Sequence, residues 1–321
     1  MMLDGLGFPE ALRWHDGALW FSDMFRSRVV RWRLDAPGSP AETVIDTASG
    51  GPVMPGGLGW LPAADGRPGD LLVVDCLERR VLRVPLDAEA RPIGAPTVHA
   101  DLRGVMSHSA NDMHVDVDGT AWVGGYGFDP EADEPAASPL VRVHPDGGID
   151  TTEATFVFPN GCERNATGAL LVAETFADRV SRLPPRRPEL SDGDVSPLSH
   201  DNGDTSLVRF AAGSGPDGLS IAPDGTVYVA LAFAGALARV DRAAGLDAEP
   251  AIVYRPEPIA SGPGAGPLGV YDCAVLPGPA VPDPARPESR RIAVAMASLD
   301  EPLAERVDTG RIVVLDLETL S

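Results

Sequence analysis

The 321-residue sequence contains no lysine, because all 26 of its basic residues are arginine. Enzymes that form a Schiff base on lysine and phosphate-binding loops that require lysine are therefore excluded. The 47 acidic residues give a formal net charge of −21. Because nucleic acids bind to clustered cations, this balance argues against a nucleic-acid partner. We interpret the acidic surface as one that keeps the protein in solution.

Cysteine is also scarce. Cys76, Cys162 and Cys273 lie far apart, which gives neither a disulfide framework nor a metal-binding spacing. The first ten residues lack the basic start and apolar core of an export signal, and no segment is apolar enough to span a bilayer. We therefore expect a cytoplasmic protein without a membrane partner. No Gly-x-Ser-x-Gly motif occurs, which argues against a serine hydrolase.

Turn-forming residues, in contrast, are abundant, with 35 glycines and 32 prolines. The stretch 214–241 illustrates their use. An apolar run at 219–221 meets the turn Pro223-Asp224-Gly225, alternating β-formers follow at 227–231, and a second hairpin returns through 237–241. This pattern predicts a meander of short antiparallel strands.

Similar units recur along the chain, at 14–35, 69–87, 117–146, 165–183 and, less regularly, 291–317. Their central strand positions are spaced by 52, 50, 49, 57 and 65 residues; they are Trp20, Leu72, Trp122, Leu171, Tyr228 and Ala293. A period near 50 is typical of a β-propeller, because a four-stranded sheet buries both faces only when neighbours stack on it. We predict an all-β, six-bladed β-propeller that forms a single domain over 1–321. Pro/Gly-rich or acidic stretches at 129–139, 184–205, 255–268 and 277–290 are predicted as loops.

Four oxygen-bearing side chains stand six or seven residues before the first hairpin turn of a repeat. They are Glu10, Asn111, Asn160 and Asp217. Because the innermost strand of each blade begins at one rim of the central channel, we expect these side chains to converge near the axis. The chain has only four asparagines, and two of them occupy this position.

Two carboxylates and two amides in a confined place would repel one another or lose solvation unless something neutralised them. A divalent cation would do so, and an all-oxygen set suits calcium, magnesium or manganese. Zinc is an alternative, although it more often takes His or Cys. The other interpretation is that Pro-Asn-Gly and Pro-Asp-Gly are ordinary turns without a ligand. The shared position favours a central metal site.

These motifs resemble the regucalcin, gluconolactonase and luciferin-regenerating-enzyme family, in order over nearly the whole chain. The segments that carry the resemblance are Phe8-Pro9-Glu10-Ala11-Leu12, Asn111-Asp112, Phe158-Pro159-Asn160-Gly161 and Gly215-Pro216-Asp217-Gly218. The resemblance implies a six-bladed propeller with one divalent cation, calcium first, and lactone hydrolysis. It implies that Glu10, Asn160 and Asp217 hold the metal. It also implies that Asn111 contacts substrate or water and that Asp217 is the catalytic base.

The sequence departs from the family at one position. Sugar-lactonase members have an arginine two residues before the asparagine that lies beside the metal, whereas this chain has Ser109, in His108-Ser109-Ala110-Asn111. This departure argues against an aldonolactone substrate. We expect His108, Ser109 and Asn111 to contact a small-molecule lactone or related carboxylic ester, hydrolysed with the metal as Lewis acid and water activator.

Two other functions remain open. One is a different metal-dependent reaction at the same site, such as an isomerisation, elimination or cyclisation through an enolate. The other is a non-catalytic, calcium-binding propeller.

Several residues also have two interpretations. His114 is either a base or a strand residue with a partner, and Cys162 is either a nucleophile or a buried apolar residue. Asp272, at the start of the last blade, either adds to the pocket or is a strand-edge carboxylate, and we favour the second interpretation. The glycines of Pro55-Gly56-Gly57-Leu58 predict space for substrate on the second blade.

Overall fold

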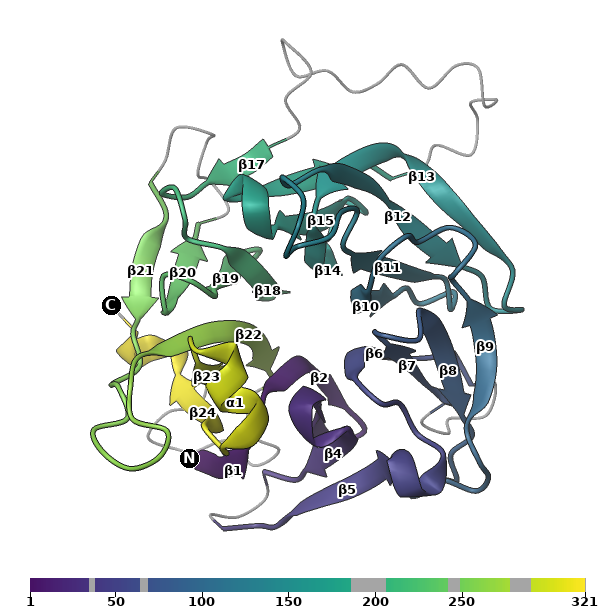
Figure 1. The fold of residues 1–321 in the computed structure, drawn as a ribbon, viewed down its shortest axis with the longest axis horizontal. Coiled ribbons are helices and arrows are strands. Elements are labelled where there is room, and N and C mark those ends of the chain that lie inside the picture. The colour runs from purple at the N-terminus through teal and green to yellow at the C-terminus, as the bar shows by residue number, and fades with distance from the viewer. Residues whose placement is uncertain (35–37, 64–68, 186–205, 242–248, 278–289, 321) are drawn as a thin grey trace.

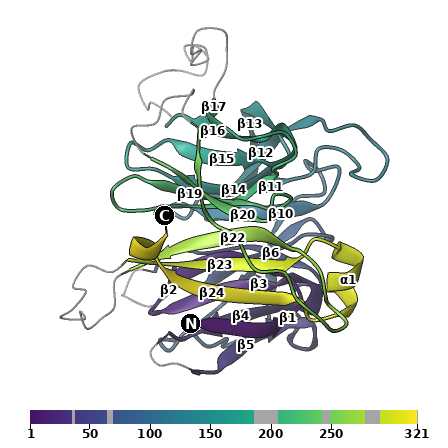
Figure 2. The same cartoon turned by 90° about the vertical axis from the view of Figure 1, so that its left-hand side faces the viewer.

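Six four-stranded antiparallel sheets stand radially around a central channel (Figure 1). The structure is a computed structural model that describes residues 1–34, 38–63, 69–185, 206–241, 249–277 and 290–320. The predicted all-β, six-bladed propeller is confirmed. Seen from the side, the short helix α1 (Glu301–Arg306) lies at one face of the ring (Figure 2).

Each of the first five blades is a meander whose first strand is innermost. The first blade contains β2 (Pro9–His15), β3 (Ala18–Asp23), β4 (Arg28–Trp32) and β5 (Ala41–Asp46). The second contains β6 (Pro55–Trp60), β7 (Leu71–Asp75), β8 (Arg80–Val84) and β9 (Thr97–Asp101), and the third β10 (Ala110–Val115), β11 (Ala121–Gly125), β12 (Ala137–Val143) and β13 (Ile149–Val157). The fourth contains β14 (Pro159–Arg164), β15 (Leu170–Glu174), β16 (Arg179–Leu183) and β17 (Ser206–Arg209), and the fifth β18 (Pro216–Ile221), β19 (Val227–Leu231), β20 (Ala236–Val240) and β21 (Ala251–Tyr254).

The sixth blade is built from both ends of the chain. It contains β22 (Leu268–Leu276), β23 (Arg291–Ser298) and β24 (Gly310–Asp316), and its outermost strand is the N-terminal β1 (Met2–Leu6). β1 pairs antiparallel with β24, with Met2 opposite Val313 and Leu6 opposite Gly310. The periodicity did not predict this closure, because β1 lies outside every repeat.

The repeat positions identify the core. Trp20, Leu72, Leu171 and Ala293 are fully buried between blades, and Tyr228 is nearly so. Trp122 is an exception because it is only half-buried. Its indole Nε1 donates to Asp116 Oδ2 at 2.7 Å, and the guanidinium groups of Arg142 and Arg164 lie over its ring.

The six innermost strands share one irregularity near their start. In each of them the pairing register with the second strand shifts, for example between Glu10 and Arg13 in β2 and between Pro216 and Leu219 in β18. A shift of this kind is a β-bulge, which redirects the side chains at that point. One equivalent residue beside each bulge defines what we call the upper ring; it directly follows a paired residue, and in β2 it is itself still paired, with Ser22. The six residues are Glu10, Gly56, Asn111, Asn160, Asp217 and Tyr271.

In some innermost strands the residue directly after the upper-ring residue is a glycine, and it lies where neighbouring innermost strands touch. A Cβ added at Gly218 would lie 1.8 Å from Asp272 Oδ1, and one added at Gly57 would lie 2.1 Å from the Met113 nitrogen. In the upper ring itself, a Cβ at Gly56 would lie 2.4 Å from the Asn111 carbonyl oxygen. The glycines of the second blade, interpreted above as space for substrate, therefore have a packing role: they let β10 approach β6.

Buried carboxylates hold the segments that precede three innermost strands. Asp23, Asp75 and Glu174, at the ends of β3, β7 and β15, are fully buried and form ion pairs with Arg28, Arg80 and Arg179. Asp23 also accepts hydrogen bonds from the backbone nitrogens of Gly7 at 2.9 Å and Phe8 at 3.1 Å. Each carboxylate thus holds the turn after the second strand of its blade against the segment that precedes the innermost strand.

The connections at this rim of the channel include η1 (Met24–Arg26), η3 (Thr175–Ala177) and α1. Of the predicted loops, 129–136 and 255–267 contain no named strand, whereas 137–139 begins β12 and 268 begins β22. Residues 186–205 and 278–289 lie outside the described residues. Within the described ranges, no helix has the length and apolar character needed to cross a bilayer.

Asp23→Ala should lower the free energy of unfolding by about 3 kcal/mol, because it leaves Arg28 and two buried backbone N–H groups without their acceptor. Urea denaturation would measure this loss. The matched control is Asp70→Ala, which removes the more exposed pair with Arg83 and should cost about 1 kcal/mol or less. Equal losses in the two variants would contradict the structural role of Asp23.

Candidate functional site

The upper ring brings together the four side chains that the sequence singled out. Asn111 Nδ2 donates a hydrogen bond to Asn160 Oδ1 at 2.8 Å, and Asn160 Nδ2 donates to Thr175 Oγ1 at 3.3 Å. Asn160 and Asp217 are buried, while Glu10 and Asn111 keep part of their surface exposed. The convergence follows from the bulge, because equivalent positions of six blades meet at the axis.

Negative charge accumulates in this ring. Burial raises the pKa of Glu10, and the charges of Asp217, Asp272 and Asp112 raise it further. Burial also raises the pKa of Asp217, as do Asp272, Asp112 and Glu301. Both carboxyl groups therefore favour a proton or a cation at neutral pH.

The residues of the upper ring fit a divalent cation. Asp217 Oδ1 is buried and has no hydrogen-bond partner, although buried oxygen atoms rarely go without one. Around it stand carboxylate and amide oxygens, the donors that hard cations prefer. Among the described residues, no group of three His, Cys, Asp or Glu side chains could hold a metal ion. The expected set contains only two such side chains, and its third donor is the amide of Asn160.

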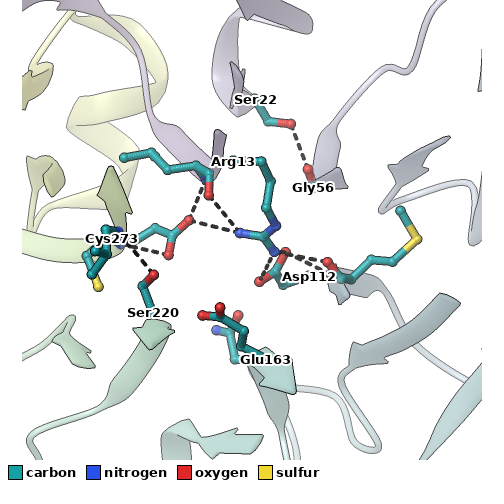
Figure 3. Close-up of polar contacts among 12 residues, drawn as sticks. Arg13, Ser22, Gly56, Asp112, Glu163, Ser220 and Cys273 are labelled. Atoms are coloured by element: carbon teal, nitrogen blue, oxygen red, sulfur yellow. Dashed lines mark hydrogen bonds and ion pairs between the residues drawn. The ribbon is translucent and has the colours of Figure 1, made fainter. Parts of the chain in front are cut away.

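A second layer closes the channel beneath the upper ring (Figure 3). Arg13 Nη2 lies 2.8 and 3.0 Å from the two carboxylate oxygens of Asp112 and donates to the Met113 carbonyl at 2.9 Å. Arg13 Nη1 lies 3.6 Å from Asp272 Oδ2, which also accepts from the Leu12 nitrogen at 2.5 Å. Burial raises the pKa of Asp272 to about 7, with Arg13 opposing the rise and Asp112 adding to it.

Asp272 is a fully buried channel residue. The interpretation favoured from the sequence, a strand-edge carboxylate, is therefore wrong, and the alternative that Asp272 adds to the pocket fits its position beside Arg13. No Asp-Gly turn follows β22, so the register that located the other blades could not be read there. Four channel residues also form one set that was not recognised from the sequence: Arg13, His114, Glu163 and Ser220. Each stands three residues after an upper-ring residue, a spacing that is visible in the sequence.

The channel opens below this layer into a cavity of about 630 Å³ lined by Arg13, His114, Glu163 and Ser220 among others. His114 lies here, with its Nε2 3.2 Å from Asp116 Oδ1. This position supports the interpretation of His114 as a strand residue with a partner. Cys162 is buried, and burial raises the pKa of its thiol well above the usual range, which favours its apolar interpretation.

His108 and Ser109 precede β10 on the side of the upper ring. The Ser109 carbonyl accepts a hydrogen bond from the Tyr126 nitrogen at 3.0 Å, and His108 Nδ1 lies 2.9 Å from Ser107 Oγ. Both residues are half-buried. Their contact with a substrate stays a prediction.

A family profile described as the SMP-30/gluconolactonase/LRE-like region matches residues 8–254. The chain belongs to this family. No curated protein sequence matches it.

Among solved structures, a luciferin-regenerating enzyme has 18% identity and a TM-score of 0.68 over 98% of this chain and 93% of its own. Regucalcin from Agrobacterium tumefaciens has 17% identity and a TM-score of 0.61 over 97% and 91%. A gluconolactonase from Xanthomonas campestris has 18% identity and a TM-score of 0.59 over 98% and 89%. At these identities the similarity shows the shared propeller fold.

The raised pKa of Asp272 predicts how stability depends on pH. Between about pH 4 and pH 7 the folded protein holds a proton that the unfolded carboxyl group has released. The contribution of Asp272 to the free energy of unfolding of chelator-treated protein should therefore fall as pH rises through that range. Asp272→Asn should make the fall smaller, as measured by urea denaturation at several pH values. The exposed control Asp118→Asn should keep the wild-type slope, and an unchanged slope in Asp272→Asn would contradict the assignment.

Proposed function

We propose that the protein is a divalent-metal-dependent hydrolase of lactones or related carboxylic esters, with its active site at the upper ring. The observation that supports it most is the buried, unpartnered Oδ1 of Asp217, which shares one ring with Glu10 and Asn160. Membership of the SMP-30/gluconolactonase/LRE-like family supports the same reaction class. The substrate is a small molecule, and we infer that residues 1–321 act as a single domain because β1 completes the sixth blade.

Glu10, Asn160 and Asp217 would hold the cation through oxygen atoms. Calcium is the first expectation, and magnesium or manganese suits the same donors, whereas zinc fits them less well. When bound, such a cation supplies Lewis acidity toward a carbonyl oxygen and lowers the pKa of a bound water molecule.

The side chains of the ring have separate roles in this proposal. Asp217 accepts the proton of the attacking water on the carboxylate oxygen that does not hold the cation. Burial and the charges of Asp272, Asp112 and Glu301 raise its pKa and so favour this role. Asn111 orients the substrate through its amide, beside Asn160. Arg13, held by Asp112 and Asp272, closes the lower end of the site, so substrate enters from the face that carries η1, η3 and α1.

Product analysis separates this proposal from its two alternatives. Hydrolysis yields the open hydroxy acid, whereas an enolate reaction yields an isomer, an elimination product or a cyclised product. A non-catalytic calcium-binding propeller would bind the metal and turn over neither esters nor lactones.

Glu10→Gln and Asp217→Asn should each remove bound metal and lower hydrolysis on the order of 100-fold or more, because each deletes a charged donor. Metal content after dialysis and kcat/KM on an aryl ester would be measured together. Glu163→Gln is the matched control, since its carboxyl group lies in the same channel below Arg13 and accepts from the Ile221 nitrogen. Full activity in either ring variant would count heavily against the proposal.

A turnover screen over lactones and aryl esters, with and without chelator, tests metal dependence directly. We expect hydrolysis to be lost in chelator and to return when calcium, magnesium or manganese is added. The midpoint of thermal unfolding should rise with the same ions, since a ligand that binds only the folded state stabilises it. Hydrolysis that is insensitive to chelator would contradict the assigned role of the metal.

A further inference from the structure

Four turns around the upper ring carry a large apolar side chain at one position. Each lies two residues after the end of the second strand of its blade, and we call them the mouth residues: Phe25, Leu77, Phe176 and Phe233. Leu77 is 51% exposed, Phe176 37% and Phe233 44%. Phe25 is half-buried and packs against the core. The three exposed apolar groups at one blade position mark a surface that binds something apolar.

The mouth residues stand next to the upper ring. The second strands end opposite the start of the innermost strands, with Asp23 paired to Pro9 and Glu174 paired to Pro159. Phe233 packs against Gly215, where an added Cβ would lie 2.5 Å from its ring. That glycine precedes Pro216 and Asp217, so the Phe233 ring lies beside the strand that carries the proposed base.

Aromatic rings join the turns of the fourth and fifth blades into one surface. The Tyr126 and Phe158 rings stack at 3.8 Å, Phe158 lies 5.6 Å from Phe176, and Phe176 lies 5.9 Å from Phe233. Phe158 comes directly before Pro159 and Asn160. An apolar surface thus runs over the third, fourth and fifth blades and reaches the ring that carries the amides.

Three of these four turns carry arginine, and each arginine is held by protein groups. Arg26 pairs with Asp308, and Arg79 donates to the carbonyl oxygens of Met106 and Ser107. The others pair with buried carboxylates; they are Arg28, Arg80 and Arg179. These cations are therefore committed to the fold, and the groups that the turns present outward are mostly apolar.

We propose that the site takes lactones or esters whose reacting group carries an apolar alkyl or aryl body, in preference to polyhydroxylated ones. The inference rests on the proposed function, because it places the reacting carbonyl at the upper ring and the apolar body against the mouth residues. Each methylene buried there should raise kcat/KM by about two- to fourfold.

The kinetic test compares δ-valerolactone, its alkyl-substituted homologues and glucono-δ-lactone. We expect kcat/KM to rise with alkyl length and to be lowest for the sugar lactone. Leu77→Ala, Phe176→Ala and Phe233→Ala should each lower kcat/KM for the longest homologue about fivefold, through KM, and that for δ-valerolactone less than twofold. Ile93→Ala is the control, since Ile93 is 63% exposed and lies between β8 and β9, outside the four turns.

A binding test without turnover keeps this inference separate from the proposed reaction. Calorimetry would compare δ-valerolactam with a δ-lactam that carries an octyl chain, on metal-loaded wild type and the same variants. Tighter binding of the octyl lactam that is lost in the mouth variants supports the inference even if no lactone is hydrolysed. Equal binding of the two lactams, or a wild-type preference for the sugar lactone, would overturn it and leave hydrolysis intact. Absence of all turnover would count against the reaction alone.

Discussion

Crowding at the axis is the constraint on which the rest of the structure depends. Six strands start close to one another, and each carries a bulge that turns side chains toward the channel. Glycine is required where two such strands touch, as at Gly57 and Gly218. The positions that keep a side chain carry carboxyl, amide or phenol groups, so the packing that closes the ring also concentrates buried oxygen atoms.

Burying those oxygen atoms is unfavourable, and in two of the three layers arginine side chains neutralise them. Below the upper ring, the guanidinium of Arg13 partners Asp112 and lies near Asp272. At the outer side, arginines neutralise the carboxylates at the ends of β3, β7 and β15. Within the described part of the chain, no arginine pairs with a carboxylate of the upper ring, and Asp217 keeps an unpartnered oxygen there. A divalent ion is the neutralising charge that this arrangement suits best.

Much of the architecture could be predicted because local patterns repeat. The hairpin turns gave both the number of blades and the register of Glu10, Asn111, Asn160 and Asp217. The rest depends on contacts between distant residues, which no period reports. Asp272 lacks a following Asp-Gly turn, Arg13 meets a carboxylate 99 residues away, and the turn aromatics form a surface only once the blades are adjacent.

The strand β1 links the two ends of the polypeptide in one sheet, because among the described strands it pairs with β24 alone. During synthesis, this N-terminal segment must wait until residues 310–316 have left the ribosome before it can pair. Until then the sixth blade lacks its outermost strand, although β22 can already contact β2. Completion of the ring by β1 is consequently a late step in the folding of the nascent chain.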